Sequence, residues 1–259
     1  MIRTQTYTAS DAGLGANSHL LIGDREVMLV DTQFLISEAK KVVDLIHETG
    51  KRLTTIFVTH EHPDHHFGIR TLKTAFPDAR VLARPETVAA IDRTAAAKME
   101  QWRPVYGADI PATYERPEVH DAATLSFEGR TIDLLDLGAG ESETGTALHL
   151  REDKLLLSAD FVYRDVFAWI VANHPAAWLR TLERLDRLAD VETVLPGHGP
   201  SSGREAIRGM GEYLRTFADV VASSPTPEAA KGALRRRFPG HRLAIMMEMS
   251  VDDAFSRKG

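Results

Sequence analysis

Hydrophobic and polar positions follow one another along the chain in patterns that predict short strands and helices in turn. Residues 53–59 are largely β-branched and apolar, which indicates a buried strand. Further on, Ile69, Leu72 and Phe76 recur at helical spacing, so a helix is expected over residues 68–76. A polar loop joins the two elements. Strand, polar loop and helix in that order is how open α/β folds place ligand sites at the ends of strands.

The neighbouring residues extend this unit to a β-β-α-β pattern with a further strand and helix. Two apolar runs flank Asp24-Arg25 and are typical of a hairpin. A helix is expected to begin near Ser37 and to end at Gly50, where it leads into the strand at 53–59. The other elements expected in this part are strands at 17–23, 26–31 and 80–83, and a helix that begins with Pro85 and ends near Arg103.

Residues 104–117 contain three prolines and two tyrosines without periodicity, so a long loop is expected there. Long irregular loops in compact domains are usually functional. The helix and loop over 85–117 are therefore expected to lie over a site and to shape its pocket. An ordinary surface excursion is the alternative.

The second half of the chain predicts a second group of strands and then mostly helices. Two strands flank Glu128-Gly129 between residues 124 and 137. Asn173 is the expected cap of the next helix, and the three methionines of the last helix are expected in the core. The remaining elements are strands at 147–150, 154–159 and 191–195, and helices at 173–188, 204–222, 228–237 and 242–249.

Length and composition limit the classes of protein to consider. The 259 residues have an even spread of apolar positions and no long Gly/Ser linker, so one domain over 1–259 is expected. A net charge of −6 argues against a nucleic-acid surface. We see neither a signal-peptide core nor the ~18 apolar residues of a membrane span, so a cytoplasmic protein that acts on a small molecule is expected. The oligomeric state is left open.

The loop after the strand at 53–59 has the composition of a metal site. Four of the seven residues from 60 to 66 are histidines, in the run His60-Glu61-His62-Pro63-Asp64-His65-His66. Imidazole with carboxylate suits zinc, iron or manganese, and alternate spacing lets His60 and His62 share one ion while Asp64 and His65 face a second. The chain has no cysteine, so any metal must use His, Asp or Glu. A solvated polar loop is the alternative.

The pattern His-x-His-x-Asp-His after a hydrophobic strand resembles the signature of the metallo-β-lactamase superfamily of hydrolases. The resemblance covers about residues 17–199 and implies an αββα sandwich of two mixed β-sheets with outer helices. Residues 200–259 would then form a C-terminal helical segment. The resemblance also implies that Asp31 supports the metal loop, whereas a strand-end carboxylate that caps the next turn is the alternative.

Later strand ends supply further candidates. In the superfamily a glycine-rich turn usually carries a histidine, a later Gly/Ala-Asp a bridging aspartate, and the last turn a histidine. Here Asp160 and His198 match, and Glu141 stands at the usual histidine position. A glutamate can ligate zinc, but Glu141 could also point away. The resemblance thus implies two divalent ions, zinc first with manganese or iron as alternatives, held by His60, His62 and Glu141, by Asp64, His65 and His198, and by Asp160 between them.

This resemblance implies hydrolysis. Two metal ions ~3.5–4 Å apart can hold a bridging hydroxide that attacks an ester, lactone or β-lactam carbonyl. Asp64 or Asp160 would orient this nucleophile and take its proton. Tyr163 matches the position at which acyl-homoserine lactonases of the superfamily present a tyrosine to the substrate carbonyl, and Arg164 could pair with a substrate carboxylate. For both residues, a structural place on a half-buried segment is the alternative.

Other activities of the same fold stay open at this point. Sulfate esters rank second as substrates, and phosphodiesters third because the chain is acidic. A mononuclear iron dioxygenase would use two histidines and a carboxylate, and Glu141 removes one of those histidines. A degraded metal-binding scaffold without activity is the remaining alternative.

Overall fold

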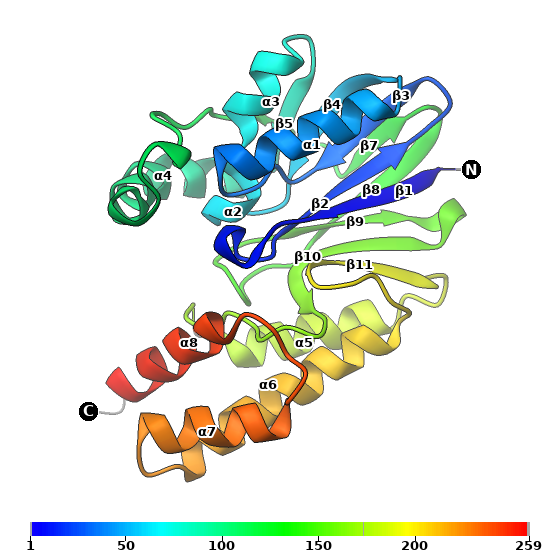
Figure 1. Cartoon of the computed structure of the whole chain (residues 1–259). Helices are drawn as coiled ribbons and strands as arrows, with labels where there is room; N and C mark the ends of the chain where they lie inside the picture. The colour runs from blue at the N-terminus through cyan, green and yellow to red at the C-terminus, as the bar shows by residue number, and fades with distance from the viewer. Residues whose placement is uncertain (1, 173, 258–259) are drawn as a thin grey trace.

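Two β-sheets face each other at the centre of the protein (Figure 1). The structure is a computed structural model that describes residues 2–172 and 174–257. The first sheet consists, in spatial order, of β1 (Arg3–Thr8), β2 (Asn17–Ile22), β3 (Glu26–Val30), β4 (Arg52–Val58), β5 (Arg80–Ala83) and β6 (Glu118–Val119). The second consists, in spatial order, of β11 (Thr193–His198), β10 (Leu155–Tyr163), β9 (Thr146–Leu150), β8 (Arg130–Asp136) and β7 (Thr124–Phe127).

Helices cover the outer faces of both sheets. The first sheet is covered by α1 (Ile36–Glu48), α3 (Ile69–Ala75) and α4 (Pro85–Tyr106), while the short α2 (Pro63–His66) lies at its edge. The second is covered by α5 (Pro175–Asp186) and α6 (Glu205–Ser223), and α7 (Pro227–Arg237) and α8 (Ala244–Ser256) pack against α6. The αββα sandwich expected from the sequence is thus confirmed. Among the described residues, no helix combines the length and the apolarity that a bilayer crossing requires.

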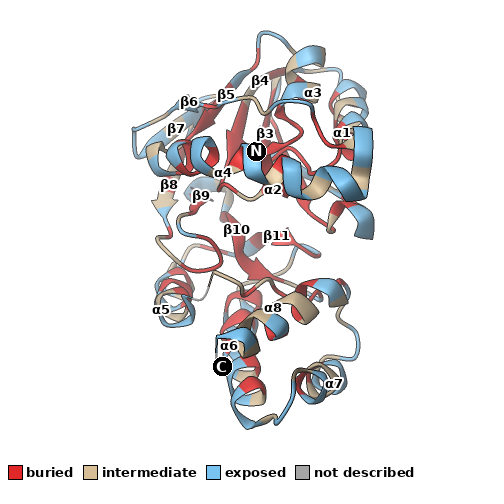
Figure 2. Ribbon diagram, turned by 90° about the vertical axis from the view of Figure 1, so that its left-hand side faces the viewer, coloured by how far each residue is buried: buried red, intermediate tan, exposed pale blue. Residues whose placement is uncertain are grey.

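Strand β3 shows how the sequence pattern produces these layers. Val27 and Leu29 pack in the cluster under α1, whereas Met28 and Val30 pack in the cluster between the two sheets. Successive side chains of a strand point to opposite faces, and here both faces are covered. The strand is therefore apolar throughout, and Figure 2 shows the central strands as the buried part of the molecule.

Parallel pairing brings several strand ends to one edge of the sandwich. Strands β3, β4 and β5 run parallel to one another, and so do β10 and β11. Parallel strands need crossover connections, which α1, α3 and α5 provide. The two sheets are also tied together, because the Asn17 side-chain amide at the start of β2 donates to the carbonyls of Pro196 and Gly199, at 2.9 and 2.7 Å.

Two strands of the structure, β1 and β6, were not predicted from the sequence. Strand β1 is an edge strand of mostly exposed polar residues, and it pairs antiparallel with β2. It carries no hydrophobic pattern because little of it is buried. Strand β6 consists of two exposed residues that pair with β5. Both segments are strands because they pair with a neighbouring strand of the sheet, and not because of their own residue pattern.

Several elements extend beyond their expected ends, among them β11, which continues past residue 195 to His198. Helix α4 continues through Pro104 to Tyr106, because a proline in the last turn removes only one backbone hydrogen bond. Helix α8 continues to Ser256, past the expected end at residue 249. Strand β10 continues through Asp160 to Tyr163 instead of ending at Ala159. The expected cap Asn173 lies outside the described residues.

Candidate metal centre

Acidic and imidazole side chains from both sheets meet at the edge where β4 and β11 end. The structure brings together all seven residues expected as metal ligands, and their ligand-type atoms form two groups within which the atoms lie no more than 4.8 Å apart. All except His62 are buried. The residues are His60 and His62 after β4, Asp64 and His65 on α2, Glu141 between β8 and β9, Asp160 on β10, and His198 at the end of β11.

The first group joins the loop after β4 to the loop after β8. The Nδ1 atom of His62 lies 2.8 Å from Glu141 Oε1, and His60 Nε2 lies 3.6 Å from Glu141 Oε2. The Asp160 carboxylate completes the group, with Oδ2 at 3.8 Å from His60 Nε2. Glu141 therefore faces the two histidines and does not point away.

The second group joins α2 to the end of β11. The Oδ2 atom of Asp64 lies 3.3 Å from His198 Nε2 and 3.6 Å from His65 Nε2. Asp160 also faces this group, with Oδ1 at 3.2 Å from His65 Nε2 and Oδ2 at 3.1 Å from His198 Nε2. Asp160 is thus the residue that lies between the two groups.

Hydrogen bonds behind the imidazoles set which ring nitrogen faces the centre. His65 donates from Nδ1 to Asp31 Oδ2 at 2.9 Å, and His198 donates from Nδ1 to the Leu14 carbonyl at 2.9 Å. A histidine whose Nδ1 carries the proton presents an unprotonated Nε2. In their neutral, metal-binding form both histidines would therefore direct the Nε2 lone pair into the cluster.

Asp31 holds this arrangement from behind. Its Oδ1 accepts from the Thr59 backbone N–H at 2.9 Å, and its Oδ2 accepts from the Thr59 hydroxyl at 2.8 Å. The same hydroxyl lies 2.9 Å from His60 Nδ1 and can accept its proton. One buried carboxylate thus orients the loop after β4 and His65 together, which is the supporting role that the resemblance implies for it.

The donor atoms fit a divalent cation. Five buried atoms at the cluster make no hydrogen bond to any described residue: Nε2 of His60, His65 and His198, Oε2 of Glu141 and Oδ1 of Asp160. These atoms approach their neighbours to between 3.1 and 3.8 Å, but without hydrogen-bond geometry. Buried polar atoms without partners are costly, and imidazole and carboxylate are the ligands of zinc, manganese and iron. The cluster can therefore hold divalent metal.

The electrostatics of the cluster also favour a cation. Burial raises the pKa of the Glu141 carboxyl to about 7. Burial lowers the pKa of His62, but the facing Glu141 outweighs this and raises it to about 9, so a shared proton stays on the imidazole. In His198, Asp160 and Asp64 likewise overcome burial and raise the pKa to about 10. The carboxylates thus stabilise positive charge at the positions that face them.

A bend in β10 carries Asp160 into the site. Ala159 has a left-handed backbone with φ 47°, and the pairing of β10 with β11 shifts register on both sides of it. A left-handed conformation costs an alanine roughly 1–2 kcal/mol, so the surrounding structure must stabilise it. Gly197 of β11 provides the space, because a Cβ there would lie 1.7 Å from Asp160 Oδ1.

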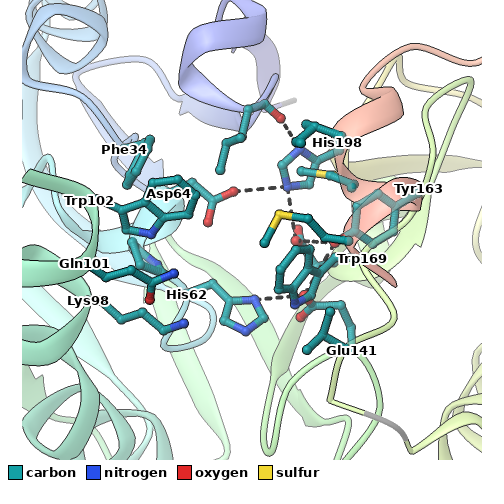
Figure 3. A pocket seen from close by; sticks show the side chains of 17 residues that line it. Phe34, His62, Asp64, Lys98, Gln101, Trp102, Glu141, Tyr163, Trp169 and His198 are labelled. Atoms are coloured by element: carbon teal, nitrogen blue, oxygen red, sulfur yellow. Dashed lines mark hydrogen bonds and ion pairs between the residues drawn. The ribbon is translucent and has the colours of Figure 1, made fainter. Parts of the chain in front are cut away.

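The centre forms the floor of a cavity of about 270 Å³ (Figure 3). Aromatic and aliphatic side chains form most of its walls. On one side α4 contributes Lys98, Gln101 and Trp102, and on the other α8 contributes Met246 and Met249. Helix α4 thus shapes the pocket as expected, whereas no described residue of the following segment 107–117 lines it.

Tyr163 belongs to the centre. Its hydroxyl donates to Asp160 Oδ2 at 2.7 Å and lies 3.4 Å from Glu141 Oε1. Its ring stacks on His198 with the ring centroids 5.0 Å apart and an interplanar angle of 4°. Burial, followed by the charges of Asp160 and Glu141, raises the pKa of its hydroxyl well above the usual value. Tyr163 is therefore a neutral hydrogen-bond donor at the floor of the cavity.

Arg164 does not join the centre, contrary to the expectation. Its guanidinium lies 3.2 Å from Glu205 on α6 and 3.5 Å from Asp165. It lines a separate cavity and is absent from the described lining of the metal pocket. Successive residues of a strand point to opposite faces, so the chain direction that aims Tyr163 inward aims Arg164 outward.

Most residues of the cavity walls carry no motif that singles them out in the sequence. These residues share a large side chain and a position outside the histidine motif: Leu14, Phe34, Lys98, Gln101, Trp102, Trp169, Val171, Ile245, Met246 and Met249. The available signals were the helix expected from Pro85, which was predicted to shape the pocket, and the apolar, methionine-rich end of the chain, which was expected in the core. Ile245 is in fact 49% exposed, as befits a residue at the mouth of a pocket.

Comparison with known proteins identifies the family. A family model described as the metallo-beta-lactamase superfamily matches residues 11–198. The chain belongs to this superfamily. The solved structures agree on the fold: a metallo-beta-lactamase from Pontibacter korlensis superposes with a TM-score of 0.63 at 16% identity over 83% of this chain and 94% of that one. The DIM-1 metallo-beta-lactamase superposes with a TM-score of 0.64 at 19% identity over 83% and 93%.

Two curated relatives have named activities. The chain is 25% identical over 170 residues to acyl-coenzyme A thioesterase MBLAC2 of Gallus gallus, a match that covers 61% of each chain. It is 24% identical over 163 residues to hydroxyacylglutathione hydrolase of Rhizobium meliloti (strain 1021), covering 62% of this chain and 54% of the relative. The chain thus spans less than two thirds of the length of these relatives.

Proposed function

We propose that the protein is a hydrolase that uses two divalent metal ions to cleave an ester, lactone or β-lactam bond in a small molecule. Zinc is the first choice of metal, with manganese or iron as alternatives. The observation that carries the proposal is the set of five buried, unpartnered nitrogen and oxygen atoms at the floor of a largely apolar cavity. Ligand pockets of enzymes commonly combine such an apolar wall with a few convergent polar groups.

The distances support a division of the ligands between two ions. His60, His62 and Glu141 would hold one, and Asp64, His65 and His198 would hold the other. Asp160 faces both groups and would bridge them. Each group supplies nitrogen and oxygen atoms only, a donor set that zinc, manganese and iron all accept.

The chain's own residues suit hydrolysis. Bound divalent ions supply a water of lowered pKa and polarise a carbonyl oxygen. Asp64 and Asp160, which both face His198 at the floor, would orient that water and accept its proton. The Tyr163 hydroxyl, which donates to Asp160, would donate instead to the oxygen of the substrate carbonyl. The apolar walls exclude bulk water from the reacting atoms.

The relatives add thioesters to the substrates to be tested. One is named a thioesterase for acyl-coenzyme A, and the other a hydrolase of hydroxyacylglutathione. A thioester has the same electrophilic carbonyl as an ester, so the same arrangement serves both. Sulfate esters, phosphodiesters, iron-dependent dioxygenation and a scaffold without activity stay as alternatives.

Metal content and two substitutions test the proposal. We expect about two metal ions per chain after reconstitution, and hydrolysis of at least one ester, thioester, lactone or β-lactam. Asp64→Ala and His198→Ala should each lose metal and lower kcat/KM by ~10²–10⁴-fold, while circular dichroism shows a folded protein. Asp44→Ala, which removes an exposed carboxylate on α1, should behave like the parent.

The outcomes separate the alternatives. Metal content near zero after reconstitution would favour the scaffold, and one iron without hydrolysis would favour the dioxygenase. Turnover of sulfate esters or phosphodiesters alone would favour a sulfatase or a phosphodiesterase over a hydrolase of carbonyl substrates. Full turnover in Asp64→Ala or His198→Ala would show that the ligand assignment is wrong.

A further inference from the structure

The cavity above the metal centre is apolar except at one place. Trp102 of α4 and Met249 of α8 lie among its walls, together with Trp169. Lys98 is the only lysine or arginine among the described residues that line it. An apolar wall does not stabilise the charge of an ammonium group, so the position of Lys98 suggests a ligand that does.

Lys98 has no anionic partner within the described part of the chain. No described carboxylate lies within ion-pair distance of it, whereas Arg93, more than one turn earlier on α4, pairs with Glu143 at 2.5 Å. Lys98 is half-buried. Figure 3 shows its side chain extending from α4 into the pocket on the side of His62. The amine thus lies at the pocket with no described carboxylate at ion-pair distance to neutralise it.

Gln101 adds a second donor at the same place. Residues three apart on a helix are neighbours on one face, and Gln101 also lines the cavity. In Figure 3 its amide lies beside the Lys98 side chain. An ammonium and a neighbouring side-chain amide are together suited to bind the oxygens of an anion.

The floor of the cavity does not compete for that anion. Asp64, Glu141 and Asp160 contribute three negative charges, which offset most of the positive charge of two divalent ions. With a hydroxide nucleophile the sum is zero. Attraction of an anionic substrate group is therefore left to Lys98, at the wall.

We propose, on the basis of the hydrolase function proposed above, that the substrate carries a carboxylate, separated from the scissile carbonyl by an apolar spacer, and that Lys98 and Gln101 bind this carboxylate. The spacer packs against Trp102, Trp169 and Met249. A carboxylate fits better than a phosphate, because a phosphate monoester carries about −1.5 to −2 charges at neutral pH and Lys98 supplies one positive charge.

A pair of substrates that differ only in this charge provides the test. The probes are 4-nitrophenyl hydrogen suberate and its methyl ester, and the measured quantity is the ratio of their kcat/KM values. Lys98→Gln should lower the ratio of anionic to neutral substrate by about 5- to 30-fold, mainly through KM, because the ion pair contributes equally to ground and transition states. Lys98→Arg should keep most of the ratio.

A matched control removes general charge effects. Lys40→Gln removes an exposed lysine of α1 that does not line the cavity, and it should leave the ratio unchanged. A ratio in Lys98→Gln within twofold of the parent would overturn the proposal. So would an equal fall of the ratio in Lys40→Gln.

A binding measurement separates this proposal from the hydrolase function. Calorimetry of the metal-loaded protein with 4-phenylbutyrate and 4-phenylbutyramide should show a preference for the carboxylate, and Lys98→Gln should reduce that preference by about 5- to 30-fold. If neither ester is cleaved but this reduction is seen, the hydrolase function fails and the carboxylate site stands. An undiminished preference in Lys98→Gln would overturn the carboxylate site even if both esters are cleaved.

Discussion

Replacing Asp31 by asparagine tests whether this carboxylate positions the metal loop or only caps a turn. Asp31 is 2% exposed and accepts three hydrogen bonds, two from Thr59 and one from His65. Its backbone is left-handed with φ 62°, a conformation that asparagine adopts readily. The substitution therefore changes hydrogen bonding and charge, and leaves shape and backbone almost unaltered.

The expected loss of metal affinity in Asp31→Asn follows from the contacts of the two carboxylate oxygens. An asparagine has one acceptor oxygen and one NH₂ group, so the NH₂ must face either the Thr59 backbone N–H at the Oδ1 position or the Thr59 hydroxyl and His65 Nδ1–H at the Oδ2 position. At least one buried donor is then left without a partner, which costs about 1–3 kcal/mol. Loss of the partner of a metal-binding histidine typically lowers metal affinity ~10–100-fold, or about 1.4–2.7 kcal/mol. The two estimates agree, so a 10- to 100-fold loss is expected.

The assay is competition for zinc with a chromophoric chelator, measured for the parent, Asp31→Asn and Asp44→Asn. Asp44 is an exposed carboxylate of α1, so its substitution controls for net charge. Urea unfolding of each variant reports whether the fold is retained. A zinc affinity of Asp31→Asn within twofold of the parent, in a folded protein, would refute the positioning role and leave Asp31 as a cap of the turn.

Three further predictions concern other parts of the chain. Gly197→Ala should weaken metal binding, because the added Cβ would displace Asp160. Gly209→Ala is the control, because the space around its Cβ is open, and it should bind metal like the parent. Metal titration measures both variants. Glu141→His should shift metal preference towards zinc and move the acidic limb of the kcat profile to lower pH, and parent-like behaviour would argue against Glu141 as a ligand. Burial lowers the pKa of His19 to about 4, so the folded state binds this proton less well than the unfolded chain, and stability falls as pH drops from about 6.5 to about 4. His19→Gln should remove up to about 2 kcal/mol of the loss between pH 7 and 5 in urea unfolding, and an unchanged loss would contradict this origin.

The local pattern of the chain was sufficient to predict the central layers and the first ligand loop. The apolar run at 53–59 and the histidines after it lie close together in sequence, so strand, loop and ligand spacing could all be read locally. The same holds for the hairpin of β2 and β3, whose turn residues and apolar runs are contiguous. Local hydrophobic patterns carry this information because each element buries its own faces.

Other features depend on contacts between distant segments, and only the tertiary structure decided them. The outward direction of Arg164 follows from the bend at Ala159 and from the contact with Glu205. The strand character of β1 follows from its pairing with β2, since its own residues are polar. The pocket walls come from α4 and α8, which are far apart in sequence and approach the same floor from opposite sides. The sequence around Lys98 does not indicate a function. Lys98 differs from other lysines only in the folded structure, where it lines the cavity and no described carboxylate lies within ion-pair distance.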